Sequence, residues 1–308
     1  MNLYLSIQYL FYSLIGIIKG YNIYNIKKSA LLSKLIYDCD DKNIDYNKGI
    51  DYNNINKLSY ELLLNNNIKF NKHIFTNLNE KYHCSKSNKD IFGYFYNNKI
   101  YCIILLDHEC KEINTIFRGS SYLNEWIQNF NLFETKLDFN ENYKMHSGIY
   151  NMYTYENADK NIINILKYLY LNFYNYKKVF NAHSKGCINS ILTAYQLTND
   201  KDYIDQLYNK NFQIYCFGNP PVFNLELAKK ICNLNNIKIL NIINDFDIIP
   251  NLQYNYHIGD EIIIHDDYTL SIKKKSEPYK YDNKICLFNL FLCIQNHDLD
   301  KYMKLIFT

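Results

Sequence analysis

Ser184 stands at the end of a short apolar segment, inside the stretch Ala182–Gly186, and a helical pattern begins directly after it. A small residue, a variable residue, serine, a variable residue and glycine form the pattern of a nucleophile elbow. This sharp strand-to-helix turn raises a serine hydroxyl above the edge of a sheet. A serine hydroxyl is almost never ionised at neutral pH, so it needs a histidine base, and that histidine needs a carboxylate. The elbow therefore predicts an acid after a later strand and a histidine near the C-terminus.

The chain supplies both groups in that order. Asp245 and Asp247 both follow a predicted strand, Ile237–Ile243, and His297 lies close to the C-terminus. The order Ser, Asp, His is the one found in α/β-hydrolases. Each residue also has a simpler interpretation, since a serine before a helix commonly caps it and a single histidine is commonly structural. The residues alone favour Ser184 as the nucleophile and His297 as the base. They leave Asp245 and Asp247 as alternatives for the acid.

The elements that must position these residues alternate between strands and helices. Short β-branched and aromatic segments predict strands at Ile91–Tyr96, Ile100–Leu106, Glu112–Phe117, Lys177–Asn181, Phe212–Phe217 and Ile237–Ile243. Apolar residues at helical spacing predict helices at Asn25–Cys39, Ile149–Tyr174, Ile188–Leu197 and Leu225–Cys232. This alternation predicts an α/β fold with a mostly parallel central sheet and helices on both faces. Without an internal repeat or a linker, residues 21–308 are expected to form one domain.

The composition limits the kinds of molecule that the protein is expected to bind. The 308 residues hold 34 Lys and Arg against 31 Asp and Glu, a net charge of +3. No dense basic stripe points to nucleic acid. The nine cysteines form no C-x-x-C pair and no spaced set with histidines, so the sequence indicates no metal site. No glycine-rich phosphate loop is present either, and we expect no cofactor. The sequence does not indicate an oligomeric state.

Residues 1–20 form a separate segment. Leu3–Ile18 is an apolar run that ends at Lys19 and Gly20. It is shorter than the ~20 residues that span a bilayer but suits a signal-peptide core or a membrane anchor. Against a signal peptide, no Lys or Arg precedes the run and no Ala-x-Ala site follows it. A leader or anchor implies a secreted or membrane-associated protein; the alternative, a buried N-terminal helix, implies a cytoplasmic one.

Several further stretches carry a resemblance. From about Ala30 to His297 the chain resembles the class 3, fungal-type triacylglycerol lipases, a family of the α/β-hydrolase superfamily. The matching stretches are Ser29–Cys39 (first helix), Thr115–Ser120 (F-R-G-[ST]), Glu125–Phe130 (lid), Met145–Tyr150 (V-H-x-G-F), Ala182–Gly186 (G-H-S-L-G), Cys216–Pro220 (F-G-x-P) and Asn244–Pro250 (N-x-x-D-x-V-P). Each motif alone is moderately specific for the family. Their occurrence together and in the same order along the chain makes the resemblance strong.

The resemblance implies roles for individual residues. The family's acid is the aspartate followed by two apolar residues and proline, which is Asp247; Asp245 is then a neighbour. The oxyanion hole would consist of the Ser120 N–H and hydroxyl and the Lys185 N–H. Trp126, the only tryptophan, would lie on the lid, unless it is a plain core residue. His146 and His183 are expected to be structural.

The implied activity is hydrolysis of carboxylic ester bonds of lipids, triacylglycerol foremost, at a lipid–water interface and through an acyl-enzyme. A phospholipase A1-type esterase is the first alternative, and a catalytically weak module that binds lipid or protein is the second. Departures from the family motivate both. Lys185, Cys187 and Pro221 replace an apolar residue, glycine and arginine respectively. Lys185 is expected to place a cation near the mouth of the site.

Overall fold

The computed structural model of the chain describes residues 17–18, 21–38, 83–85, 89–96, 99–120, 133–207, 209–252, 255–265, 267–281 and 296–307. The predicted lid segment with Trp126 and the apolar run up to residue 16 lie outside these residues. At the end of that run, β1 (Ile17–Ile18) pairs with β2 (Tyr21–Asn22) in an antiparallel arrangement. No helix within the described ranges is long and apolar enough to cross a membrane.

A nine-stranded sheet runs through the described part of the chain, in the order β13-β12-β11-β10-β9-β6-β5-β4-β3. Its five central strands, from β12 to β6, are parallel to their neighbours. The outer strands on both sides are antiparallel. The strands are β3 (His83–Ser85), β4 (Lys89–Tyr96), β5 (Lys99–Asp107), β6 (Glu112–Phe117), β9 (Lys177–His183), β10 (Phe212–Phe217), β11 (Ile237–Asn244), β12 (Asp260–Ile264) and β13 (Leu270–Lys273).

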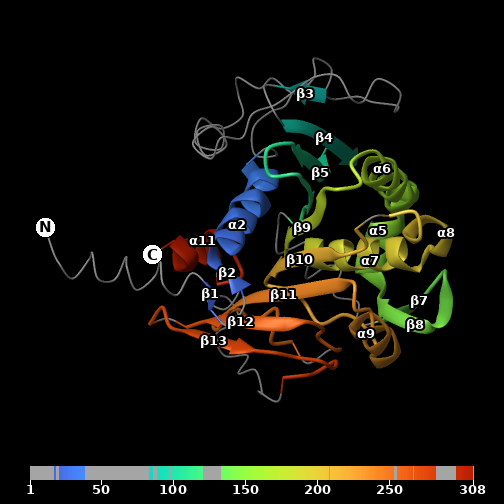
Figure 1. Cartoon of the computed structure of the whole chain (residues 1–308). Coiled ribbons are helices and arrows are strands. Elements are labelled where there is room, and N and C mark those ends of the chain that lie inside the picture. The colour runs from blue at the N-terminus through green and yellow to red at the C-terminus, as the bar shows by residue number, and fades with distance from the viewer. Residues whose placement is uncertain are drawn as a thin grey trace, which may run out of the picture.

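Helices cover both faces of this sheet (Figure 1). The described helices are α2 (Ile23–Asp38), α5 (Ser147–Thr154), α6 (Ala158–Asn172), α7 (Lys185–Asn199), α8 (Lys201–Ile204), α9 (Leu225–Cys232) and α11 (Leu299–Phe307). Helices α2 and α11 contact each other and pack with one side of β9 and β10. Helices α5, α6, α7 and α9 pack on the opposite side. The predicted fold class, an α/β sheet with helices on both faces, is confirmed.

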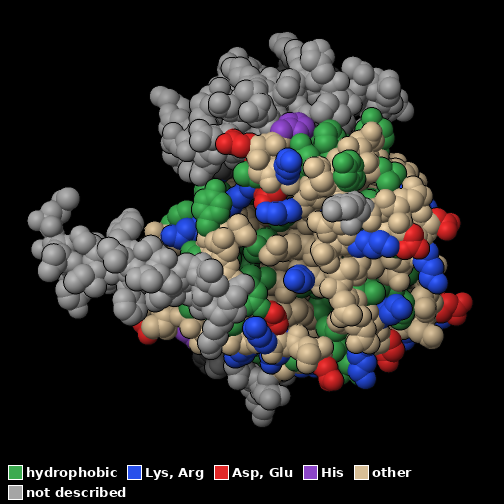
Figure 2. Space-filling model, viewed as in Figure 1, with side chains coloured by type: hydrophobic (Ala, Val, Ile, Leu, Met, Phe, Trp, Pro, Cys, Tyr) green, Lys and Arg blue, Asp and Glu red, His purple; other side chains and the backbone are tan. Residues whose placement is uncertain are grey.

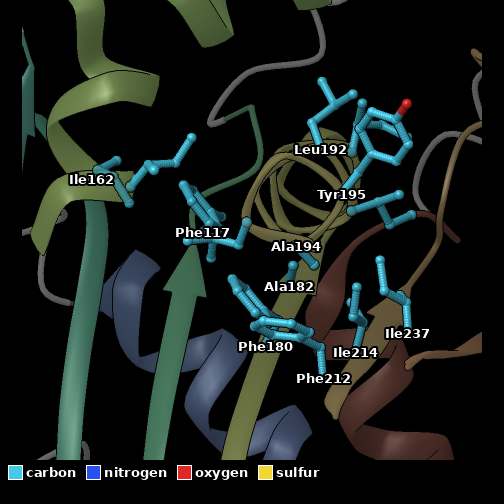
Figure 3. Close-up of a cluster of buried hydrophobic side chains, with 14 of the residues drawn as sticks. Phe117, Ile162, Phe180, Ala182, Leu192, Ala194, Tyr195, Phe212, Ile214 and Ile237 are labelled. Atoms are coloured by element: carbon cyan, nitrogen blue, oxygen red, sulfur yellow. The ribbon is translucent and has the colours of Figure 1, made fainter. Parts of the chain in front are cut away.

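Alternation along the central strands produces the two cores. In β9, Val179 faces the α2 and α11 side, while Phe180 and Ala182 face α7. Phe117, Phe180 and Phe212 come from three adjacent strands and line up beneath α7 (Figure 3). Because both faces of β9 are covered, nearly every residue of the strand is buried, as expected for a central parallel strand.

The structure corrects one predicted element and adds others. The single helix expected over Ile149–Tyr174 is wrong: α5 ends at Thr154, and a 3-10 turn, η1 (Tyr155–Asn157), separates it from α6. Glu156 and Asn157 both have positive φ there, a conformation that a continuing α-helix excludes. The chain also forms a hairpin that the sequence analysis missed, β7 (Glu134–Leu137) with β8 (Asn140–His146), and the elements β12, β13 and α11.

The surface is mixed in charge. On the face in Figure 2, Lys and Arg side chains are interspersed with Asp and Glu. Surfaces of this kind favour solubility without creating one strong field.

Phe180→Ala tests the core under α7. Phe180 is fully buried in the central strand β9, so its truncation leaves a cavity between the sheet and α7. We expect the free energy of unfolding to fall by roughly 3–5 kcal/mol, measured by urea denaturation. Tyr174→Ala, at an exposed aromatic side chain, is the control and should change stability by less than about 0.5 kcal/mol. Equal losses for the two variants would contradict this packing.

Candidate active site

Ser184 lies at the sharp turn between β9 and α7. Its backbone has φ 56° and ψ −132°, a strained conformation that proteins retain mainly at functional positions. Its N–H donates to the Phe217 carbonyl at 2.8 Å, which ties the turn to the end of β10. The turn also needs glycine at 186, because a Cβ there would lie 2.4 Å from the Phe117 carbonyl oxygen. The sequence pattern of the elbow therefore reflects a tight crossing of α7 over β6.

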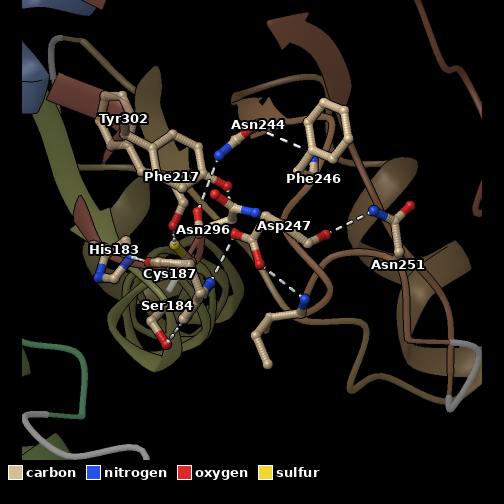
Figure 4. A network of polar contacts seen from close by, with 12 residues as sticks. His183, Ser184, Cys187, Phe217, Asn244, Phe246, Asp247, Asn251, Asn296 and Tyr302 are labelled. Atoms are coloured by element: carbon tan, nitrogen blue, oxygen red, sulfur yellow. Dashed lines mark hydrogen bonds and ion pairs between the residues drawn. The ribbon is translucent and has the colours of Figure 1, made fainter. Parts of the chain in front are cut away.

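His297 bridges Ser184 and Asp247. These two residues are far apart in the sequence but lie close together in Figure 4. Its Nε2 lies 2.8 Å from Ser184 Oγ and its Nδ1 lies 2.7 Å from Asp247 Oδ2. Ser184 follows β9, Asp247 lies on the loop after β11, and His297 precedes α11. All three are buried. The structure thus brings together the serine, the aspartate and the histidine that the sequence indicated.

The Asp247 carboxylate is fully buried and accepts hydrogen bonds at both oxygens. Oδ1 accepts from the Ile249 N–H at 2.9 Å. Oδ2 contacts His297 Nδ1 and accepts the Tyr302 hydroxyl at 2.5 Å. Burial and then Asp247 raise the pKa of Tyr302 well above its usual value, so this phenol stays protonated and remains a donor. A buried carboxylate without such donors would be strongly destabilising.

Sequence reasoning missed Tyr302. It lies on α11, between the sheet and α2, and is fully buried. The amphipathic spacing of Leu299 and Tyr302 after His297 is a signal that could have placed a helix here. No sequence pattern predicts that the Tyr302 hydroxyl contacts the Asp247 carboxylate.

Glycine at 218 allows the imidazole and the carboxylate to approach each other. Gly218 has φ +62°, and a Cβ there would lie 2.8 Å from His297 Cε1 and 2.9 Å from Asp247 Oδ2. Its N–H donates to the Ile242 carbonyl at 3.1 Å, which keeps the end of β10 beside β11. Any side chain at this position would push His297 away from Asp247.

His183 supports His297 through the backbone. Its Nε2 lies 2.7 Å from the His297 carbonyl oxygen, and its Nδ1 lies 2.9 Å from the Tyr37 hydroxyl. Burial, with the nearby His297, lowers the pKa of His183 well below its usual value, so the ring is neutral. A neutral ring that donates from Nε2 to the carbonyl must accept the Tyr37 hydroxyl at Nδ1. His183 holds the loop that carries His297, in keeping with the structural role expected of it.

His146 is also placed away from the serine. It precedes α5 and its Nδ1 accepts the Ile149 N–H at 3.4 Å, capping the helix. Burial lowers the pKa of this histidine. The capping role agrees with the structural one expected from the sequence.

The second candidate acid, Asp245, does not contact His297. Its carboxylate is exposed and Oδ2 lies 2.8 Å from Nδ1 of another histidine, His265. Of the two aspartates, the structure therefore places Asp247 next to the base.

Ser120 and Lys185 flank the elbow. Ser120 follows Gly119, at which a Cβ would lie 3.1 Å from Ser184 Cβ. Lys185 is the first residue of α7, directly after Ser184. The expectation that the Lys185 side chain places a cation at the mouth is wrong. The residue is only 6% exposed, and its Nζ contacts Met152 Sδ on α5 at 3.6 Å. The stem packs against α5 because the first turn of α7 faces that helix.

Cys187 occupies a buried position under the elbow, where its thiol lies 3.4 Å from the Ala182 carbonyl oxygen and 3.5 Å from that of Phe217. The thiol fills the space without changing the turn. Within the described ranges, no group of three or more His, Cys, Asp or Glu side chains could hold a metal ion. The arrangement at Ser184 needs none, because a histidine-activated serine can attack an acyl carbon by itself.

Part of the chain matches a known protein family. Residues 115–257 match the family model described as lipase (class 3). No curated protein gives a significant sequence match. The matched range contains Ser120, Ser184 and Asp247, whereas His297 and Tyr302 follow it.

Solved lipases share the fold. A deletion mutant of Rhizomucor miehei lipase in its propeptide complex gives a TM-score of 0.63 at 17% identity, over 89% of this chain and 77% of that one. Lipase II from Rhizopus niveus gives 0.57 at 19% identity, over 68% and 79%. The native Rhizomucor miehei lipase–propeptide complex gives 0.53 at 20% identity, over 62% of this chain, which spans only 61% of that chain. The chain is thus similar to the class 3 lipases over residues 115–257, and it shares the α/β-hydrolase fold of the solved lipases.

Proposed function

We propose that this chain is a lipase that hydrolyses carboxylic ester bonds of lipids, with Ser184 as the nucleophile. The observation that carries the proposal is the hydrogen-bonded series from Ser184 through His297 to Asp247, built on a strained elbow. The class 3 family match supports the same reaction class. Esters are the matching substrates because an activated serine attacks an acyl carbon.

In the proposed mechanism, Ser184 Oγ attacks the ester carbonyl carbon while His297 Nε2 takes the hydroxyl proton. The leaving alcohol receives that proton from His297, and an acyl-serine remains. Water then attacks the acyl-serine with His297 again as the base, releasing the fatty acid. Asp247 holds the Nδ1–H tautomer of His297 and stabilises the imidazolium. Tyr302 and the Ile249 N–H hold Asp247 in position.

The tetrahedral intermediate needs donors for its negatively charged oxygen. We assign these donors to the Lys185 N–H, which is the first of α7, and to the N–H and hydroxyl of Ser120. The position of Lys185 at a helix N-terminus supports this assignment, because N–H groups at helix N-termini favour negatively charged oxygens.

Triacylglycerol is the proposed substrate class, taken from a lipid–water interface. One solved neighbour, at 20% identity and a TM-score of 0.56, is named as a triacylglycerol lipase with a serine protease triad. The phospholipase A1-type alternative drew on a Lys185 cation near the mouth of the site, and that side chain is buried. Phe133 and Phe246 are large exposed aromatic residues, and Phe246 adjoins Asp247, which favours contact with an apolar surface near the site.

Ser184→Ala tests the nucleophile. We expect release of oleate from triolein emulsions to fall on the order of 10⁴-fold or more, because no other group replaces the acyl acceptor. Ser276→Ala, at an exposed serine, is the matched control and should retain full activity. Unchanged oleate release by Ser184→Ala, after its fold is checked by circular dichroism, would refute the assignment.

A substrate panel separates the alternatives. We expect the wild-type chain to release fatty acid faster from tributyrin and triolein than from phosphatidylcholine. Faster release from phosphatidylcholine would instead identify a phospholipase A1-type esterase. Binding to vesicles without any fatty-acid release, and equal for wild type and Ser184→Ala, would identify a lipid-binding module.

Tyr302→Phe tests the support of Asp247. The change removes one hydrogen bond to a buried carboxylate, an interaction of about 1.5–3 kcal/mol. We therefore expect kcat on tributyrin to fall by roughly 10- to 100-fold with little change in KM. Tyr302→Phe keeps the ring and its packing, so the unfolding midpoint should serve as a check that α11 remains docked. A change confined to KM would contradict a positioning role.

A further inference from the structure

A second Asp–His–Ser series lies outside the site described above. Nδ1 of His265 lies 2.8 Å from Asp245 Oδ2, and its Nε2 lies 2.7 Å from Ser271 Oγ. The corresponding distances around His297 are 2.7 and 2.8 Å. The order of atoms is also the same: carboxylate, Nδ1, Nε2, hydroxyl.

The sheet explains why these three residues meet. Asp245 directly follows β11, and His265 directly follows β12, a parallel neighbour of β11. Their strands therefore end at the same edge of the sheet, the one that also presents Ser184 and Asp247. Strand β13 returns antiparallel to β12, with Ser271 opposite Ile263. Ser271 and His265 thus share one face as diagonal neighbours, within reach of a long side chain.

These hydrogen bonds are not needed to hold the loop. The Asp245 N–H already donates to the Ile264 carbonyl at 3.1 Å, and the His265 N–H donates to the Thr269 carbonyl at 3.0 Å. The backbone therefore closes both the β11 loop and the β12–β13 hairpin. The side-chain hydrogen bonds instead determine which nitrogen of His265 carries the proton. A carboxylate at Nδ1 keeps the proton there, which leaves the Nε2 lone pair free to accept the Ser271 hydroxyl.

We propose that Ser271 is a second, solvent-accessible nucleophile that reacts with small activated esters. Ser271 Oγ attacks the acyl carbon of an aryl ester, and His265 Nε2 takes the hydroxyl proton. The C–O bond to the phenol breaks, the phenol leaves with that proton, and the acyl group remains on Ser271. Asp245 orients His265 throughout. A fluorophosphonate reacts in the same way, with fluoride as the leaving group.

Exposure sets the class of substrate. The side chains of His265 and Asp245 are 31% and 49% exposed, whereas Ser184, His297 and Asp247 are buried. Ser271 also lies within a strand. The residue after it therefore offers no N–H at a helix N-terminus, whereas the residue after Ser184, Lys185, does. An oxyanion donor at a helix end contributes on the order of 10²–10³ in rate. Ser271 therefore acts only on esters with good leaving groups, and not on lipid esters.

The test uses the full chain with Ser184→Ala, treated with a fluorophosphonate and, separately, with 4-nitrophenyl acetate. We expect one fluorophosphonate adduct by intact mass, mapped to Ser271 by peptide mass spectrometry. Adding His265→Gln should slow its formation by roughly 10²-fold or more, since it removes the base. Adding Ser271→Ala should abolish it. With 4-nitrophenyl acetate, an acetyl group should appear on Ser271, and His265→Gln and Ser271→Ala should reduce its formation by the same factors as with the fluorophosphonate.

Thr269 offers a matched control on the same hairpin. Its hydroxyl donates to the Asp267 carboxylate at 2.6 Å and has no histidine partner there. Ser184→Ala with Thr269→Ala should label at Ser271 as fast as Ser184→Ala alone. The proposal is overturned if Ser184→Ala forms no adduct, if the adduct lies on other residues, or if His265→Gln labels at an unchanged rate.

The outcome is independent of the proposed function. Ser271→Ala with Ser184 intact should release oleate from triolein at the wild-type rate, because Ser271 contacts neither His297 nor Asp247. If the Ser184→Ala chain forms no adduct at Ser271 while the wild-type chain hydrolyses triolein, only the second nucleophile is refuted. An adduct at Ser271 in a chain without triolein hydrolysis would refute only the lipase proposal.

Discussion

The buried carboxylate of Asp247 is the constraint on which the site depends. It lies where water cannot solvate it, so its stability rests on the donors that the fold brings to it: His297 Nδ1, the Tyr302 hydroxyl and the Ile249 N–H. These donors come from the loop before α11, from α11 itself and from the loop after β11. Helix α11 therefore supplies part of the support for the acid, and the site needs this helix in its docked position.

The same edge of one sheet carries two Asp–His–Ser series with nearly equal hydrogen-bond lengths. They differ in what surrounds them. One serine stands at a strained strand-to-helix turn, and its partners are buried. The other lies in an ordinary edge strand, and its partners are partly exposed to solvent. The chemistry available to each follows from burial and from the neighbouring N–H groups more than from the three side chains themselves.

The sequence predicted the central elements well because their patterns are local. Strands β6 and β10 and helix α9 begin and end where the apolar spacing predicted. The break between α5 and α6 was missed because a positive φ at Glu156 leaves no mark in a pattern of apolar residues. The prediction of a Lys185 cation near the mouth of the site was wrong for a different reason: the residues that bury this side chain, such as Met152 on α5, are distant in sequence. Helix α11 was missed although the spacing of Leu299 and Tyr302 is amphipathic, because so short a segment gives only a weak local signal.

By itself, the sequence indicated which residues meet at the candidate site and in what order, since an elbow, an acid after a strand and a late histidine are each visible as short motifs. It also determined the fold class, because strand and helix periodicity are local properties. The tertiary structure decided between Asp245 and Asp247, recruited Tyr302 and His183, and placed a second histidine between Asp245 and Ser271. Those choices depend on distances between chain segments, and a hydrogen bond extends over a few ångströms of space regardless of how many residues separate its partners.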